Sequence, residues 1–200
     1  PHIFDGLLDP AIYRDIPTQP YLSERLNAFL QHVTIYEEAL DRLRIFGAEQ
    51  KFLIGVRVLT GAIQPQTAAR AFSDLADILL QETLAAVTRE FESKHGKVQG
   101  GVTAILGMGK LGSRELTAGS DIDLILLYDH PEEAGESDGE RPLYPSHYYS
   151  RLTQRLIAAV AAPTAEGVLY EVDLRLRPSG NKGPVATRLP AFERYQAEDA

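Results

Sequence analysis

The 200-residue chain contains no cysteine, so disulfide bonds and thiolate metal sites are excluded. This absence is consistent with a reducing cytoplasm. No apolar run is long enough to span a membrane, and no secretory signal opens the chain. Positive charge is also scarce, because 20 lysines and arginines stand against 28 aspartates and glutamates, for a net charge of −8. That balance argues against a large nucleic-acid-binding surface.

Hydrophobic residues make up 44% of the chain and charged residues 24%, which is typical of a soluble globular protein with a sizeable core. The length suits one large domain, or one domain with a helical extension. The chain begins at Pro1 and stops within a helix-like run at residues 192–195. We therefore expect it to be part of a longer polypeptide.

The first half of the chain has the periodicity of helices. Apolar residues recur at spacings of three or four over residues 21–46 and 64–95, and a shorter apolar stretch covers residues 51–59. Gly96 is a stop signal for the last of these helices. Because no β-rich run interrupts the pattern, the sequence predicts a helical region over residues 1–98.

The pattern changes in residues 99–200, where short apolar strands alternate with turns. Strands are predicted at residues 102–106, 121–128 and 167–177, and a helix at 146–161. The second strand is apolar on both faces beyond its first residues, so it should lie in the centre of a sheet. The predicted fold class is α+β, with a helical N-terminal region followed by a small mixed sheet.

Acidic residues open the second predicted strand and recur in the third. Asp121 and Asp123 are two residues apart, so in a strand their side chains point the same way. Such carboxylates repel each other, and Mg²⁺ relieves the repulsion. On the polar face of the third strand, Asp173 precedes Arg175 and Arg177, whose planar forks suit phosphate oxygens. Three carboxylates can hold two metals about 4 Å apart. The alternative is a turn, with Asp123 in a structural salt bridge to Arg175 or Arg177.

Glycines follow the first predicted strand in the order Gly107-x-Gly109-x-x-Gly112. This spacing, with Asp129 closing the next strand, also occurs in dinucleotide-binding Rossmann proteins. The segment that leads to the next strand is too short for a Rossmann crossover helix, and that alternative leaves the aspartates unexplained. We therefore interpret the glycines as a turn whose backbone N–H groups approach a triphosphate, with the charge of Lys110 nearby.

Three segments carry a family resemblance. They are Gly-Met-Gly-Lys-Leu-Gly-Ser-Arg-Glu-Leu at 107–116, Gly-Ser-Asp-Ile-Asp-Leu at 119–124 and Tyr-Glu-Val-Asp-Leu-Arg-Leu-Arg-Pro-Ser-Gly at 170–180. As a set, they closely resemble the bifunctional glutamine synthetase adenylyltransferase/adenylyl-removing enzymes, from the helical region onward. The resemblance implies a polymerase-β-like nucleotidyltransferase fold. It also matches Asp121, Asp123 and Asp173 to the family's metal-binding, catalytic carboxylates.

The resemblance implies Mg²⁺-dependent transfer of AMP from ATP to a tyrosine of glutamine synthetase. Such enzymes have two related catalytic halves, and the other half removes AMP by phosphorolysis to give ADP. The PII signalling protein and glutamine select the direction. Residues 169–183 look more like the adenylylating half. We expect the nucleotide to contact Gly107, Gly109, Lys110, Gly112, Ser120, Arg175 and Arg177.

Two other functions compete with this interpretation. The first alternative is the opposite, deadenylylating half, and the second is a nucleotide-binding regulatory domain without chemistry. The carboxylates at positions 121, 123 and 173 argue against the second, since a domain that only binds nucleotide has less need of three acidic residues.

Overall fold

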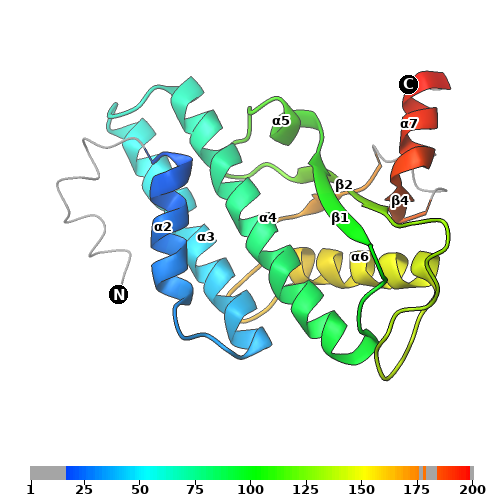
Figure 1. Ribbon diagram of the computed structural model, residues 1–200. Coiled ribbons are helices and arrows are strands. Elements are labelled where there is room, and N and C mark those ends of the chain that lie inside the picture. Colours follow the sequence, from blue (N-terminus) through cyan, green and yellow to red (C-terminus); the bar gives the residue numbers. More distant parts are fainter. Residues whose placement is uncertain (1–16, 176–177, 179–183, 199–200) are drawn as a thin grey trace.

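The structure is a computed structural model that describes residues 17–175, 178 and 184–198. Three long helices form its first part (Figure 1), as the periodicity predicts. Prolines stand in the first turns of α2 and α4, where a missing backbone N–H leaves no helical hydrogen bond unmade. Gly96 ends α4 at a φ of 67°, as its stop signal predicted. The three helices are α2 (Gln19–Leu30), α3 (Tyr36–Leu59) and α4 (Pro65–His95).

The apolar pattern over residues 21–46 is divided between two helices. It breaks at His32, whose backbone takes a φ of 70°, and α3 begins at Tyr36. That helix then continues through residues 51–59, which we predicted as a separate stretch. Gly47 and Gly55 lie within α3 without interrupting it, and the missing side chain of Gly47 makes room for a neighbour. A Cβ added there would lie 3.0 Å from Cδ1 of Leu79 in α4.

A small mixed sheet forms the second part, which confirms the α+β class. Strand β2 lies at its centre and pairs antiparallel with β1. On its other side, β2 pairs in parallel with β3 near its start and with β4 near its end. The strands are β1 (Val102–Gly107), β2 (Ile122–Asp129), β3 (Val172–Asp173) and β4 (Ala186–Arg188).

The third predicted strand, residues 167–177, was too long. Only residues 172–173 of it pair with β2, and residues 176–177 lie outside the described residues. The alternation fails because Leu169 and Tyr170 are both buried, at 2% and 5% exposure. They belong to a connection from α6 to the sheet, not to a strand. The short strand β4 was not predicted.

The helices and the sheet share one hydrophobic core. Leu22, Leu75 and Leu79 from the helices pack in the same cluster as Ile122 and Leu126 from β2. The boundary at residues 98 and 99 stays a prediction. None of the described helices is long and apolar enough to cross a membrane. The remaining helices are the short α5 (Gly109–Gly112), α6 (Pro145–Ala161), which confirms the helix predicted at 146–161, and α7 (Leu189–Glu198).

Candidate functional site

Three acidic residues meet where β2 begins. Asp121 directly precedes the strand, and Asp123 is its second residue. Asp173 comes from β3, and the parallel register pairs it with Asp123. Asp121 is exposed, whereas Asp123 and Asp173 are half-buried. Residues 50 positions apart in the sequence therefore become neighbours through strand pairing.

The acidic residues act on one another through their charges. Burial raises the pKa of Asp123 above its ordinary value, and the negative charges of Asp173 and Asp121 raise it further. The positive charges of Arg175 and Lys110 act in the opposite direction. Asp123 thus holds its negative charge less readily than an isolated carboxylate, and a nearby cation would stabilise the ionised form.

Asp173 differs from Asp123, because a neighbouring arginine satisfies its carboxylate. The Arg175 backbone N–H donates to Asp173 Oδ1 at 2.8 Å, and its Nε donates to Oδ2 at 2.6 Å. These hydrogen bonds lower the pKa of Asp173. The sequence left open a salt bridge from Asp123 to an arginine. The structure instead pairs Asp173 with Arg175, while Arg177 lies outside the described residues.

The acidic cluster fits a hard divalent cation in its chemistry. Carboxylate oxygens are ligands that Mg²⁺ prefers, and the repulsion felt by Asp123 is what a cation relieves. The present positions of the described side chains, however, do not form a metal site. Within the described part of the chain, no group of three or more His, Asp or Glu side chains is positioned to hold a metal. The carboxylate of Asp173 instead faces Arg175, and metal binding would require that pair to loosen.

The glycine turn between β1 and β2 packs directly against Asp123. Gly109 has a φ of 49°, and a Cβ on it would lie 2.3 Å from Asp123 Oδ2. The backbone N–H of Met108 also donates to the carbonyl of Asp123 at 2.8 Å. A Cβ added at Gly107 would lie 2.9 Å from Cγ and Cδ2 of Leu111, and one added at Gly112 would lie 2.9 Å from the carbonyl oxygen of Gly107. Packing within the turn therefore explains why glycine occupies these positions. Contact of the turn with a triphosphate stays a prediction.

The loop that leads into β2 is held by contacts that the sequence did not reveal. Ser120 bonds to Thr117, with its hydroxyl 2.9 Å from the Thr117 hydroxyl and 3.0 Å from the backbone nitrogen. Arg114 reaches α4, where it pairs with Asp77 and lies 3.8 Å from Asp74. No spacing rule connects an arginine to acidic residues some 40 positions earlier. Only the packing of the loop on α4 brings them together.

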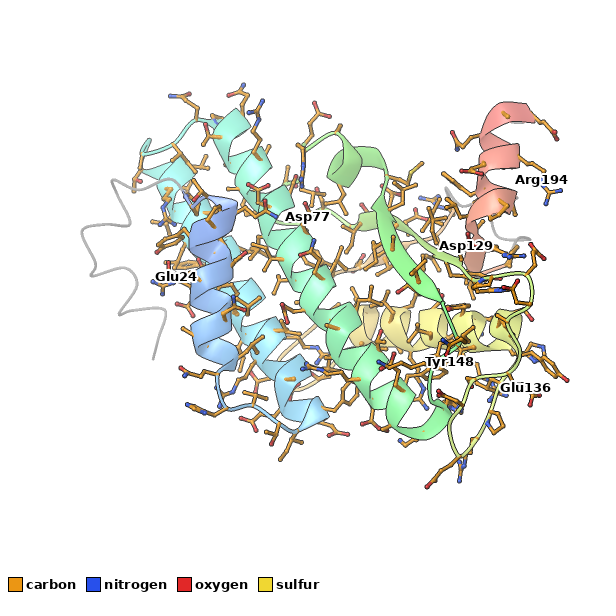
Figure 2. The ribbon with its side chains drawn as sticks, viewed as in Figure 1. Glu24, Asp77, Asp129, Glu136, Tyr148 and Arg194 are labelled. Carbon is orange, nitrogen blue, oxygen red and sulfur yellow. The ribbon has the colours of Figure 1, made fainter. Side chains whose placement is uncertain are left out.

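The Rossmann alternative is wrong for this chain. A Rossmann unit joins two parallel strands by a crossover helix, whereas β1 and β2 are antiparallel and α5 has only four residues. Asp129 lies at the far end of β2 (Figure 2), and there it bonds Arg188 of β4 at 3.2 Å. Its role is therefore an ion pair within the sheet.

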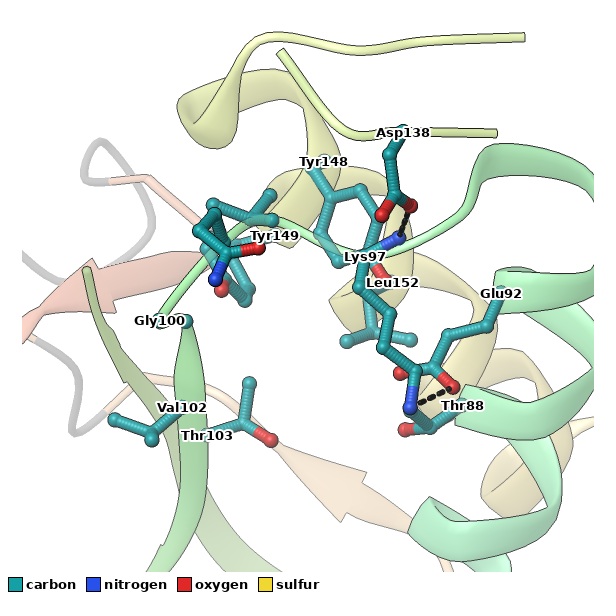
Figure 3. A pocket seen from close by; sticks show the side chains of 13 residues that line it. Thr88, Glu92, Lys97, Gly100, Val102, Thr103, Asp138, Tyr148, Tyr149 and Leu152 are labelled. Carbon is teal, nitrogen blue, oxygen red and sulfur yellow. Dashed lines mark hydrogen bonds and ion pairs between the residues drawn. The ribbon is translucent and has the colours of Figure 1, made fainter. Parts of the chain in front are cut away.

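A cavity of about 320 Å³ lies at the opposite end of β1 from the acidic cluster. Figure 3 shows its charged residues engaged with each other. Lys97 lies 3.4 Å from Glu92, and its backbone N–H donates to Asp138 at 2.7 Å. The cavity lining includes Val102, which pairs with Asp129 at the end of β2. Asp123 lies at the other end of the β1–β2 pairing, near Gly107. The cavity and the acidic cluster are therefore separate features.

A mixed sheet that presents carboxylates from two parallel strands, beside a glycine turn, is consistent with a nucleotidyltransferase-like fold. Over residues 1–200 the chain matches a family model described as glutamate-ammonia ligase adenylyltransferase. The chain belongs to this family.

Curated relatives agree with the family match. A protein of Mesorhizobium japonicum is 68% identical over all 200 residues, one of Agrobacterium fabrum is 64% identical, and one of a Bradyrhizobium species is 50% identical. Each is named bifunctional glutamine synthetase adenylyltransferase/adenylyl-removing enzyme. The match covers 100% of this chain but only 20% of each relative, so the chain spans about a fifth of their length.

Proposed function

We propose that this chain is a Mg²⁺-dependent nucleotidyltransferase catalytic domain that transfers AMP from ATP to a tyrosine hydroxyl of glutamine synthetase. The observation that carries the proposal is the pairing of Asp123 with Asp173, with Asp121 close enough for its charge to act on Asp123. The names of the curated relatives support the same reaction, since each names an adenylyltransferase.

Asp121, Asp123 and Asp173 would hold Mg²⁺, which neutralises charge on the attacking oxygen, the phosphates and the leaving group. In the reaction, the tyrosine oxygen forms a bond to the α-phosphorus of ATP. The bond from that phosphorus to the oxygen bridging to the β-phosphate breaks, and pyrophosphate leaves. The tyrosine gives up its proton to a base. Positioning and charge neutralisation supply most of the catalysis in such transfers.

Asp173 would either take the tyrosine proton or, held by the metal, orient the reacting groups. In the present structure Arg175 lowers the pKa of Asp173, and metal binding would loosen that pair. Lys110, whose charge already acts on Asp123, and Arg175 would meet the charge of the leaving pyrophosphate.

Our choice of reaction direction rests on sequence resemblance. Residues 169–183 resemble the adenylylating half more than the deadenylylating half, and part of that segment lies outside the described residues. Both directions pass AMP through the same acidic cluster, so the physical argument does not choose between them. We place the full-length protein in the cytoplasm, with the PII protein and glutamine as its effectors.

The test uses the full-length protein with its other catalytic half disabled. One reaction contains α-labelled ATP, Mg²⁺ and unmodified glutamine synthetase, and label should appear on the synthetase. A parallel reaction contains adenylylated synthetase and inorganic phosphate, and little ADP should form. ADP release without labelling would assign the chain to the deadenylylating half.

A calorimetric titration separates catalysis from simple binding. ATP should bind in the presence of Mg²⁺, and NAD should not bind, because the antiparallel β1 and β2 do not form a Rossmann unit. ATP binding with no transfer in either direction would favour a regulatory nucleotide-binding domain over an enzyme.

A further inference from the structure

Lys51 of α3 lies against the segment that leads to Asp173. Its ammonium donates to the carbonyl of Leu169 at 2.7 Å and lies 3.5 Å from the centre of the Tyr170 ring. Among the described residues, no carboxylate pairs with it. Burial accordingly lowers the pKa of Lys51 to about 8. A charged amine in this environment is unfavourable for stability, because it is desolvated without an opposite charge.

The contacts of Lys51 continue to the acidic cluster along one short segment. The backbone N–H of Tyr170 donates to the carbonyl of Val160 at 3.2 Å, which fixes the segment where α6 ends. Two residues beyond Leu169, the carbonyl of Glu171 accepts the N–H of Ile122 at 2.9 Å. Pairing with β2 then places Asp173 beside Asp123. Lys51 thus fixes the start of a segment whose end carries a proposed metal ligand.

We propose that Lys51 is a positioning residue, whose ammonium holds the Leu169–Tyr170 backbone so that Asp173 lies in register with Asp123. Val160 and Ile122 bond to the segment through their backbones and share its hydrophobic cluster, and Lys51 adds a charged side-chain contact from the helical region. Some residues orient a metal ligand without binding the metal, and their substitution typically lowers metal affinity or activity 10- to 100-fold. This inference rests on the proposed function, because it assumes that Asp173 holds Mg²⁺.

The test compares Lys51→Met and Lys51→Arg in the full-length protein with its other half disabled. Methionine keeps a long apolar side chain but removes the charge and the donor, whereas arginine keeps both. Lys94→Met is the matched control, since Lys94 is an exposed lysine that pairs with Glu90 one helical turn away. The measurements are AMP transfer as a function of Mg²⁺, Mn²⁺ binding by calorimetry in the presence of ATP, and thermal melting.

For Lys51→Met we expect kcat to fall about tenfold and the Mg²⁺ concentration for half-maximal rate to rise, with a melting temperature equal to or above that of the unaltered protein. Lys51→Arg should recover much of the loss, and Lys94→Met should change nothing. A Lys51→Met protein with unaltered kcat and metal binding would overturn the inference. So would one that fails to fold, or whose activity falls only in step with its melting temperature.

The metal titration keeps this inference separate from the proposed function. If the unaltered protein binds Mn²⁺ but transfers no AMP in either direction, the proposed function fails. Weaker Mn²⁺ binding by Lys51→Met would still support a positioning role. If the unaltered protein binds no Mn²⁺ with ATP, Lys51 has no metal ligand to position and the inference fails with it.

Discussion

Neighbouring residues of the same strand lie in very different environments. Leu124 and Leu126 of β2 are almost fully buried against the helices, and each contact there removes apolar surface from water. At the start of the strand, Asp123 lies beside Asp173 and within the field of Asp121, so like charges gather against their own repulsion. The comparison teaches that the core is arranged for stability and that the acidic cluster is maintained despite a cost in stability.

The largest effect should follow from Asp123→Asn. Transfer of AMP should fall at least about a thousandfold, because the cluster loses the carboxylate that pairs with Asp173. The melting temperature should stay the same or rise, since repulsion with Asp173 and Asp121 is relieved. Labelled-ATP assays at saturating Mg²⁺ and thermal melting measure the two effects.

Asp138→Asn serves as the control for that substitution, because Asp138 lies by the separate cavity and its amide oxygen can still accept the N–H of Lys97. Asp121→Asn should resemble Asp123→Asn. Substantial transfer by either cluster variant at high Mg²⁺ would show that the cluster does not hold the catalytic metal.

Leu79→Ala tests the contribution of the hydrophobic core. Leu79 is fully buried on α4, and its removal should lower the free energy of unfolding by about 2–5 kcal/mol. The kcat per folded molecule should remain near that of the unaltered protein, because Leu79 packs in the core and not in the cluster. Urea unfolding and active-fraction assays give the two quantities. A large loss of kcat at unaltered stability would mean that core and cluster are not separable.

Gly109→Ala should lower both AMP transfer and stability. The new Cβ would meet Asp123 Oδ2 at 2.3 Å, so Asp123 must move. We expect a loss of transfer of about a hundredfold, since small displacements of catalytic groups have effects of that size. The positive φ should also cost about 1–2 kcal/mol of stability.

Gly61→Ala is the matched control for Gly109→Ala, because Gly61 has a φ of 72° but no neighbour within 4 Å of an added Cβ. It should lose stability alone. Equal losses of transfer in both variants would show that backbone strain, and not contact with Asp123, explains the need for glycine.

The last prediction concerns the pH dependence of stability that Lys51 causes. The pKa of Lys51 in the folded protein is about 8, below its ordinary value of 10.5. Between these values the unfolded chain binds more protons, so stability rises with pH. Relative to Lys51→Met, the unaltered protein should gain on the order of 2 kcal/mol across this range, after allowance for partial solvation. Melting curves of both proteins from pH 7.5 to 10.5 measure the difference. A constant difference would mean that the ammonium is not desolvated.

Much of the architecture followed from periodicity. The helices at 64–95 and 146–161 were predicted within a residue, because their apolar faces repeat every three or four positions. The third strand was predicted too long, because alternation continued through Leu169 and Tyr170, which the core buries together. Gly47 shows a related limit. The sequence does not show that Leu79 of α4 would fill the space beside this glycine.

The acidic cluster was only partly visible in the sequence. Asp121 and Asp123 were placed together by strand alternation, and Asp173 was selected for sharing a strand face with Arg175. The sequence did not show that Arg175 would hold Asp173, or that Lys51 would reach the segment before it. Such contacts depend on distances across the fold, for which local spacing contains no information.

By itself, the sequence determined the α+β class, the acidic pair at the start of β2 and the family to which the chain belongs, because these depend on residues close together along the chain. The tertiary structure decided which groups act on that pair. It set Asp173 in register with Asp123, Gly109 against the carboxylate of Asp123, and a charged lysine from the helical region behind Asp173. The physical reason is that charge and steric contact act through space, and only the packed core brings positions 51, 109, 123 and 173 together.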